Sequence, residues 1–199
     1  EELVGAYAAL ERGGLAGRVR YTPDAPREER RLLSPEAAWI VREILASHGR
    51  PGLPEHLLQP GGRRRVAWKT GTSYGFRDAW ALGSTRGYTV GVWVGRPDGT
   101  PLPGQYGAIT ALPLLFDVVD SLPPVPGEGV RAPPPPGVAR RDICWPLGRP
   151  AEATPPALCH RRREAWTLAG QVPPTLPERD ARQWGSGELA IREEARTGL

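Results

Sequence analysis

Apolar and polar positions alternate with the period of an α-helix in two places within the first 50 residues. Residues 3–12 carry apolar side chains on one face, and two glycines follow them. Ser34 is a suitable N-cap for a second helix that ends near residue 48, with Pro35 in its first turn. The predicted buried stripe of this second helix consists of Ala37, Ile40, Val41, Ile44 and Leu45.

The segments around these helices are expected to lack helical structure. Residues 18–22 are predicted to be a short extended piece, and the charged run at 27–31 is expected on a solvated loop. Proline and glycine are frequent up to residue 62, which predicts a loop before the next regular element.

From residue 66 onward the pattern changes to the alternation of β-strands. Residues 66–72, 78–84 and 88–95 are predicted as three strands, and their short connections favour antiparallel neighbours. A third helix is predicted within 107–122. Its predicted buried stripe consists of Leu114, Leu115, Val118 and Val119. Together these elements predict an α+β fold, in which helices flank an antiparallel sheet.

Composition divides the chain into three parts. It has 199 residues, of which 39% are hydrophobic, enough for one ordinary domain and extra segments. Residues 123–137 contain seven prolines and three glycines and are predicted to be a linker. The predicted domain therefore covers 1–122. Residues 138–199 are expected to form a small irregular tail, or to begin a further domain.

The formal net charge of +4 is compatible with anionic partners, but the composition weakens this reading. The chain contains one lysine and no asparagine or methionine, so its arginine excess is typical of a biased genome composition. Arginine runs occur at 63–65 and 161–163. Nucleic-acid binding is not expected, because packing on a strand explains Trp68. No apolar run approaches the roughly 20 residues of a membrane helix. The histidines are scattered, and no metal or cofactor site is predicted.

The one lysine, Lys69, begins the sequence Lys-Thr-Gly-Thr on the first predicted strand. It supplies a fixed positive charge, and Thr70 and Thr72 supply hydroxyl groups. Gly71 lets another backbone approach the strand closely. At a sheet edge, the exposed N–H groups could pair with an extended peptide or stabilise an oxyanion. Three residues alone are a weak motif, and an ordinary strand that ends in a glycine turn is the alternative.

The surrounding sequence resembles the class A penicillin-binding proteins, and within them the 1C group. The resemblance rests on KTGTSYGFRDAWALG, YTVGVWVGRPDGTPLPG and ALPLLFDVV, which are similar to the end of the transpeptidase domain. AYAALERGG and LSPEAAWIVREIL are similar to segments that precede this motif. DICWPLG and CHRRREAWTL are similar to the region that follows the domain in the 1C group.

This resemblance implies a bifunctional peptidoglycan synthase, with glycosyltransferase and D,D-transpeptidase activities. Its implied partners are peptidoglycan stem peptides, β-lactams and other cell-wall proteins. Lys69 is then part of the catalytic electrostatics, and Thr70, Gly71 and Thr72 bind the substrate. The backbone N–H of Thr72 is an implied oxyanion donor. The implied location is the periplasmic side of the inner membrane, with a membrane anchor only in a part that precedes this chain.

Two elements of the family pattern are absent from the sequence. The nucleophile motif Ser-x-x-Lys would place a serine at position 66, which is Val66. The motif Ser-x-Asn cannot occur without asparagine. We therefore expect that this chain alone has no transpeptidase activity and does not react covalently with penicillin. The alternative function is a non-catalytic periplasmic module that binds peptides at its sheet edge.

The two cysteines, Cys144 and Cys159, enclose a short segment of the C-terminal region. The periplasmic location implied by the resemblance favours a disulfide between them, worth about 3 kcal/mol for such a loop. Two unpaired buried thiols are the alternative. With His160 as the third group, the two cysteines are too few for a zinc site.

Overall fold

The computed structural model describes residues 1–52, 64–172, 175–178 and 180. The chain forms two compact units, Glu1–Pro133 and Pro134–Leu199. The division falls within the proline-rich segment 123–137, and the three parts given above stay a prediction. None of the described helices combines the length and the apolar character that a membrane span requires.

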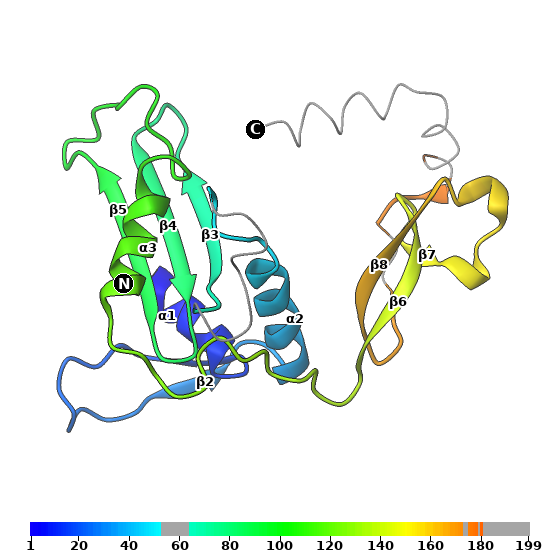
Figure 1. Cartoon of the computed structure of the whole chain (residues 1–199), viewed down its shortest axis with the longest axis horizontal. Coiled ribbons are helices and arrows are strands. Elements are labelled where there is room, and N and C mark those ends of the chain that lie inside the picture. The colour runs from blue at the N-terminus through cyan, green and yellow to red at the C-terminus, as the bar shows by residue number, and fades with distance from the viewer. Residues whose placement is uncertain (53–63, 173–174, 179, 181–199) are drawn as a thin grey trace. The chain divides into compact units, whose positions relative to one another are not determined.

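The described residues of the first unit form three helices and five strands, which are labelled in Figure 1 where there is room. In chain order they are α1 (Glu2–Glu11), β1 (Leu15–Gly17), β2 (Glu29–Arg31), α2 (Pro35–Ala46), β3 (Ala67–Thr72), β4 (Asp78–Ser84), β5 (Thr89–Gly95) and α3 (Ala111–Ser121). The central sheet has the antiparallel order β3-β4-β5, as the strand alternation predicts. The predicted bounds of its strands differ from the observed ones by one residue at most.

Helices cover both faces of the central sheet (Figure 1). A side chain at Gly83 would lie 2.9 Å from Leu115 of α3, whereas a side chain at Gly91 would lie 2.7 Å from Val4 of α1. Gly83 pairs with the residue before Gly91, and neighbouring positions on a strand face opposite sides. Helices α3 and α1 therefore pack on opposite faces of the sheet.

The main core lies between the sheet and α3. Its buried members are Val66, Ala79, Ala81, Ala111, Leu112, Leu115, Phe116 and Val119, and the valines of β5 pack against them. Small alanines on β4 let α3 approach the strand closely, while Leu112 and Leu115 fill the space between them. The predicted stripe of α3 is half right, because Leu114 and Val118 are 46% and 41% exposed.

The predicted buried stripe of α2 is wrong for two of its members. Val41 and Ile44 are exposed, and the helix instead buries Ala38, Trp39 and Glu43. The apolar periodicity misplaces the buried face because Glu43 is a charged residue held inside by arginine partners. The cap is as predicted, since the Ser34 hydroxyl accepts the backbone N–H of Ala37 at 3.2 Å.

The segment between α1 and α2 also differs from the expectation. Strands β1 and β2 pair as a small antiparallel sheet, so Glu29–Arg31 is a strand and not a loop. All three residues of β2 are exposed, which removes the apolar alternation that marks a strand. Residues 18–22 contain no strand.

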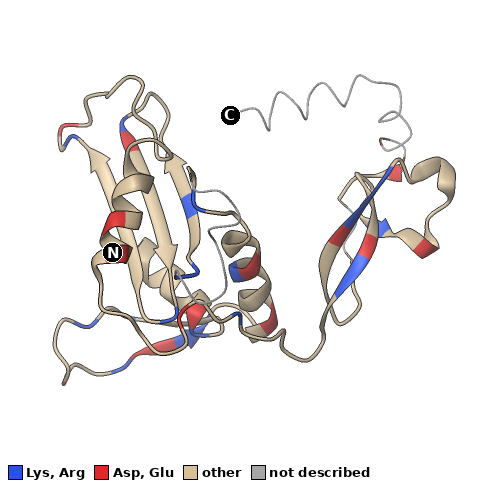
Figure 2. Ribbon diagram, viewed as in Figure 1, with Lys and Arg blue, Asp and Glu red and all other residues tan. Residues whose placement is uncertain are grey.

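The second unit is more regular than the irregular tail that we predicted. It contains β6 (Val138–Trp145), β7 (Arg149–Pro150), two short 3₁₀ helices (Ala151–Ala153 and Pro156–Leu158) and β8 (Arg161–Leu168), in the antiparallel order β7-β6-β8. Basic and acidic positions lie on both long strands (Figure 2). Their central residues are exposed on both faces, so the sequence lacks an apolar alternation there.

The predicted disulfide between Cys144 and Cys159 is present. It joins the end of β6 to the residue after the second 3₁₀ helix, beside the fully buried Leu147. Leu158 and Leu176 complete this small apolar cluster. Few apolar side chains are buried among the described residues of this unit. The disulfide therefore contributes a large share of the stability of the unit.

Candidate functional site

The Lys-Thr-Gly-Thr sequence lies on β3, which is the edge strand of the central sheet among the described residues. Lys69 and Gly71 lie on the face of the sheet that carries α1, and both are exposed. Thr70 and Thr72 point to the opposite face, toward the residues that precede α3. The strand thus presents its charge on one face and its hydroxyl groups on the other.

The backbone of β3 presents unpaired groups along its outer edge. Ser73 donates its N–H to the carbonyl of Asp78 at 3.0 Å, and hydrogen-bonded pairs alternate with non-bonded pairs in an antiparallel ladder. The N–H and C=O groups of Thr70 and Thr72 therefore point away from β4. The outer edge thus carries two N–H and two C=O groups that no strand among the described residues pairs.

The ammonium group of Lys69 folds toward this edge. Its Nζ donates a hydrogen bond to the carbonyl oxygen of Thr70 at 2.6 Å, which places the positive charge beside the outward-facing backbone. An ammonium has three donors, so two of them remain for other acceptors. Positive charge and backbone donors therefore occupy the same edge of the strand.

Gly107 holds the end of β3 in place. Its N–H donates to the hydroxyl oxygen of Thr72 at 3.1 Å. A Cβ on Gly107 would lie 2.5 Å from the carbonyl oxygen of Trp80 and 2.7 Å from that of Gly71. No side chain fits there without moving the backbone. The loop before α3 therefore lies directly against the Lys-Thr-Gly-Thr residues.

Two tryptophans on β4 and β5 lie on the face of the sheet that carries Lys69 and Gly71. Trp80 is the cross-strand neighbour of Gly71, and Trp93 is the neighbour of Trp80, with a ring separation of 6.5 Å. Trp93 is 42% exposed, which excludes a core role. Its indole N–H donates to Asp78 at 2.8 Å, and this bond is the main cause that lowers the pKa of Asp78.

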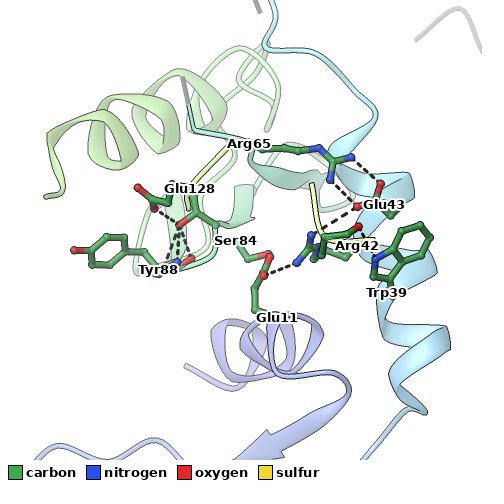
Figure 3. Close-up of polar contacts among 11 residues, drawn as sticks. Glu11, Trp39, Arg42, Glu43, Arg65, Ser84, Tyr88 and Glu128 are labelled. Carbon is green, nitrogen blue, oxygen red and sulfur yellow. Dashed lines mark hydrogen bonds and ion pairs between the residues drawn. The ribbon is translucent and has the colours of Figure 1, made fainter. Parts of the chain in front are cut away.

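A buried carboxylate, Glu43, lies at the other end of β3 (Figure 3). Glu43 is only 3% exposed. Arg65, just before β3, contacts both of its oxygens at 2.6 and 2.9 Å, and Arg131 approaches at 2.7 Å. Burial raises the pKa of Glu43, but its hydrogen bonds and charge interactions with Arg65 and Arg131 outweigh this and lower it.

A second carboxylate, Glu11, extends this network to α1 (Figure 3). It accepts hydrogen bonds from Arg42 at 2.9 Å and from the hydroxyl of Ser84 at 3.2 Å. Here burial is the dominant effect, and it raises the pKa of Glu11 despite the nearby charge of Arg42. The network connects α1, α2, β4 and the residues before β3.

The residues after α3 are bound to the same end of the unit. Glu128 accepts hydrogen bonds from the hydroxyl of Thr85 at 2.9 Å and the N–H of Val125 at 3.0 Å, and its carboxylate contacts Arg64 at 3.0 Å. The indole N–H of Trp39 donates to the carbonyl of Ala132 at 3.2 Å. The start of the proline-rich segment is therefore fixed to the first unit.

These contacts give the first arginine run a structural role. Arg64 and Arg65 bind carboxylates inside the first unit, while Arg63 lies outside the described residues. In the second run, Arg163 lies over the ring of Trp145, 5.3 Å from its centre. Sequence reasoning missed Glu43 and Gly107. Neither residue had a signal in the sequence, since Glu43 lies outside the predicted apolar stripe of α2.

Comparison with known proteins shows which proteins this chain resembles. Residues 137–167 match the family model described as the penicillin-binding protein 1C linker domain. Penicillin-binding protein 1C of Escherichia coli is 45% identical over 182 residues, which cover 90% of this chain. Penicillin-binding protein 1A of Clostridium botulinum is 32% identical over 93 residues, which cover 45% of this chain and 11% of that protein.

The fold agrees with that of a solved relative. The crystal structure of penicillin-binding protein 1A from Haemophilus influenzae superposes with a TM-score of 0.60 at 18% identity, covering 86% of this chain and 32% of that one. The predicted α+β class and the predicted resemblance are both confirmed. The chain spans 23% of the length of its E. coli relative.

Proposed function

Because this chain is a relative of penicillin-binding protein 1C, we propose that it supplies the Lys-Thr-Gly-Thr strand of a serine D,D-transpeptidase. The longer protein would be a peptidoglycan synthase that also carries a glycosyltransferase domain. The observation that carries this proposal is the arrangement on β3. The charge of Lys69 and the outward backbone groups of Thr70 and Thr72 share one open strand edge.

The proposed reaction is acyl transfer to and from a serine outside this chain. The serine hydroxyl attacks the carbonyl between the two D-alanines of a stem peptide, and the terminal D-alanine leaves. An amine of a neighbouring stem then attacks the acyl-enzyme, which forms the cross-link and releases the serine. Penicillin acylates the same serine, but no second stem resolves that product.

Residues of β3 have separate roles in this reaction. Lys69 supplies a compact positive charge near the reacting groups, where the planar fork of an arginine would fit differently. The hydroxyls of Thr70 and Thr72 bind the terminal carboxylate. The Thr72 oxygen already accepts the N–H of Gly107, so its own proton remains available for that carboxylate. The N–H of Thr72 donates to the developing oxyanion.

Gly71 completes the substrate-binding edge by leaving space. An added Cβ would have one neighbour within 4 Å, the Cβ of Trp80 at 3.8 Å, so the glycine leaves the strand surface open. An extended stem peptide could then pair with the outward groups of β3 as an additional strand. The non-catalytic alternative uses the same surface, namely a module that binds stem peptides at this edge without reacting.

The isolated chain is expected to remain unmodified by penicillin, because it has no serine at position 66. The measurement is the intact mass of the 199-residue chain after incubation with benzylpenicillin. The control is the longer protein under the same conditions, which should gain the mass of one penicillin. An adduct on the isolated chain would contradict the assignment of the nucleophile to another part of the protein.

A further inference from the structure

A pocket of about 410 Å³ lies at the end of the sheet opposite Thr72. Its wall contains charged side chains from two helices and two loops, namely Glu11, Arg42, Arg65 and Arg86. Gly129, Val130 and Ala132, which follow α3 in the chain, form another part of the wall. The volume falls within the range of about 300–1,000 Å³ that is typical of small-molecule sites.

The charges that line this pocket do not balance. Three arginines line it, whereas Glu11 is the one carboxylate in the wall and Glu43 contacts Arg42 and Arg65 from beside it. Glu43 is also shared with Arg131, so at least one positive charge is left in excess. Arg86 carries it, because no ion pair or hydrogen bond of Arg86 is found within the described part of the chain.

The two paired arginines also keep donors for a ligand. The guanidinium of Arg65 uses two N–H groups on the carboxylate of Glu43, and a guanidinium has five. Arg42 is 18% exposed and Arg65 is 26% exposed, so both are held largely out of water. Charges in such surroundings interact more strongly with an anion than fully solvated charges do.

Small apolar residues complete the wall. Ala46, Ala67 and Val130 line the pocket beside the arginines. A ligand with an anionic group and a short carbon body would match both kinds of surface. Ala67 also lies on β3, two residues before Lys69 and on the same face. An occupant of the pocket would thus contact the strand that carries the Lys-Thr-Gly-Thr sequence.

We propose that this pocket binds a small organic anion through a carboxylate or phosphate group, with Arg86 as the main charge partner. The N–H groups of Arg42 and Arg65 that are not used by the glutamates complete the anion site. This site is separate from the proposed transpeptidase edge, and it requires neither Lys69 nor a serine. The isolated chain should therefore bind the anion without the rest of the longer protein.

The test is calorimetric titration of the 199-residue chain with succinate and, separately, with inorganic phosphate, at constant low ionic strength. We expect saturable binding of at least one of them at a single site. Binding of one anion alone identifies the ligand group as carboxylate or phosphate. Arg86→Gln should weaken binding about fivefold, which corresponds to the loss of one exposed ion pair. Glu11→Gln should strengthen binding, because it removes the competing carboxylate.

Matched surface variants distinguish a site from a general charge effect. Arg96→Gln and Glu36→Gln change the net charge by the same amounts, and neither residue lines the pocket. They should leave the affinity unchanged. The proposal is overturned if neither anion binds saturably at millimolar concentrations, or if Arg86→Gln and Arg96→Gln have the same effect. Arg86 is exposed, so its substitution tests the site without affecting the core.

Discussion

Replacing Glu43 with alanine is expected to lower the free energy of unfolding by about 3–5 kcal/mol, the usual cost of breaking a buried ion pair. Glu43 is 3% exposed and contacts three arginines. Its removal takes away the carboxylate that these guanidinium groups share, although Arg42 keeps its contact with Glu11. Arg65 immediately precedes the core residue Val66, so the beginning of β3 would lose its main polar anchor.

The measurement is urea unfolding of the wild-type chain and the variant, followed by tryptophan fluorescence. Glu36→Ala on the same helix is the control, because this partly exposed first-turn residue favours the helix dipole by at most about 1 kcal/mol. If both variants lost the same small amount of stability, the buried network would not be the anchor that the structure indicates.

The pH dependence of stability gives a second readout of the same residue. The folded-state pKa of Glu43 is lowered, because contacts with Arg65 and Arg131 outweigh the effect of burial. Its contribution to stability is therefore complete above the unfolded pKa of the carboxyl and is lost as the pH falls through the folded pKa. Glu43→Ala should remove this part of the acid sensitivity.

Replacing Lys69 with alanine in the longer protein is expected to slow acylation by penicillin by about 10²–10³-fold. The variant loses the positive charge that lies beside the outward carbonyl of Thr70, where the substrate edge is proposed. Stability should change little, since Lys69 is exposed. The loss should therefore appear in the rate of labelling and not in the amount of folded protein.

The rate is measured with a fluorescent penicillin, from labelled bands at increasing times. Lys69→Arg separates charge from shape, and it should recover only part of the rate, because a planar guanidinium replaces a compact ammonium. Arg77→Ala, an exposed cation five residues after Thr72, is the control and should label normally. Normal labelling of Lys69→Ala would exclude a catalytic role for this residue.

The central sheet was predictable because one face of its strands carries alternating apolar side chains that pack against α3. Alternating valines on β5 and alanines on β4 mark that buried face directly in the sequence. The long strands β6 and β8 carry charged residues on both faces, so no alternation announces them. The prediction of an irregular region there failed for this physical reason.

In the candidate site, too, the residues that are adjacent in the sequence were predicted, whereas the contacts between distant residues were not. Lys69, Thr70, Gly71 and Thr72 are adjacent, so a short motif reveals them together. The contact of Gly107 with Thr72 joins residues 35 positions apart. The role of Glu43 likewise depends on its contacts with Arg65 and Arg131. These contacts join distant parts of the sequence, and no periodic pattern in the sequence encodes them. The anion pocket depends on the same long-range contacts.

The most direct test of the account uses the source cells. Their membranes are labelled with fluorescent penicillin, and the protein that contains this chain is captured with an antibody raised against the chain. The account predicts a labelled band much larger than 21.6 kDa, which would be the synthase that supplies the serine. An unlabelled band near 21.6 kDa would contradict it, and would favour the non-catalytic peptide-binding module.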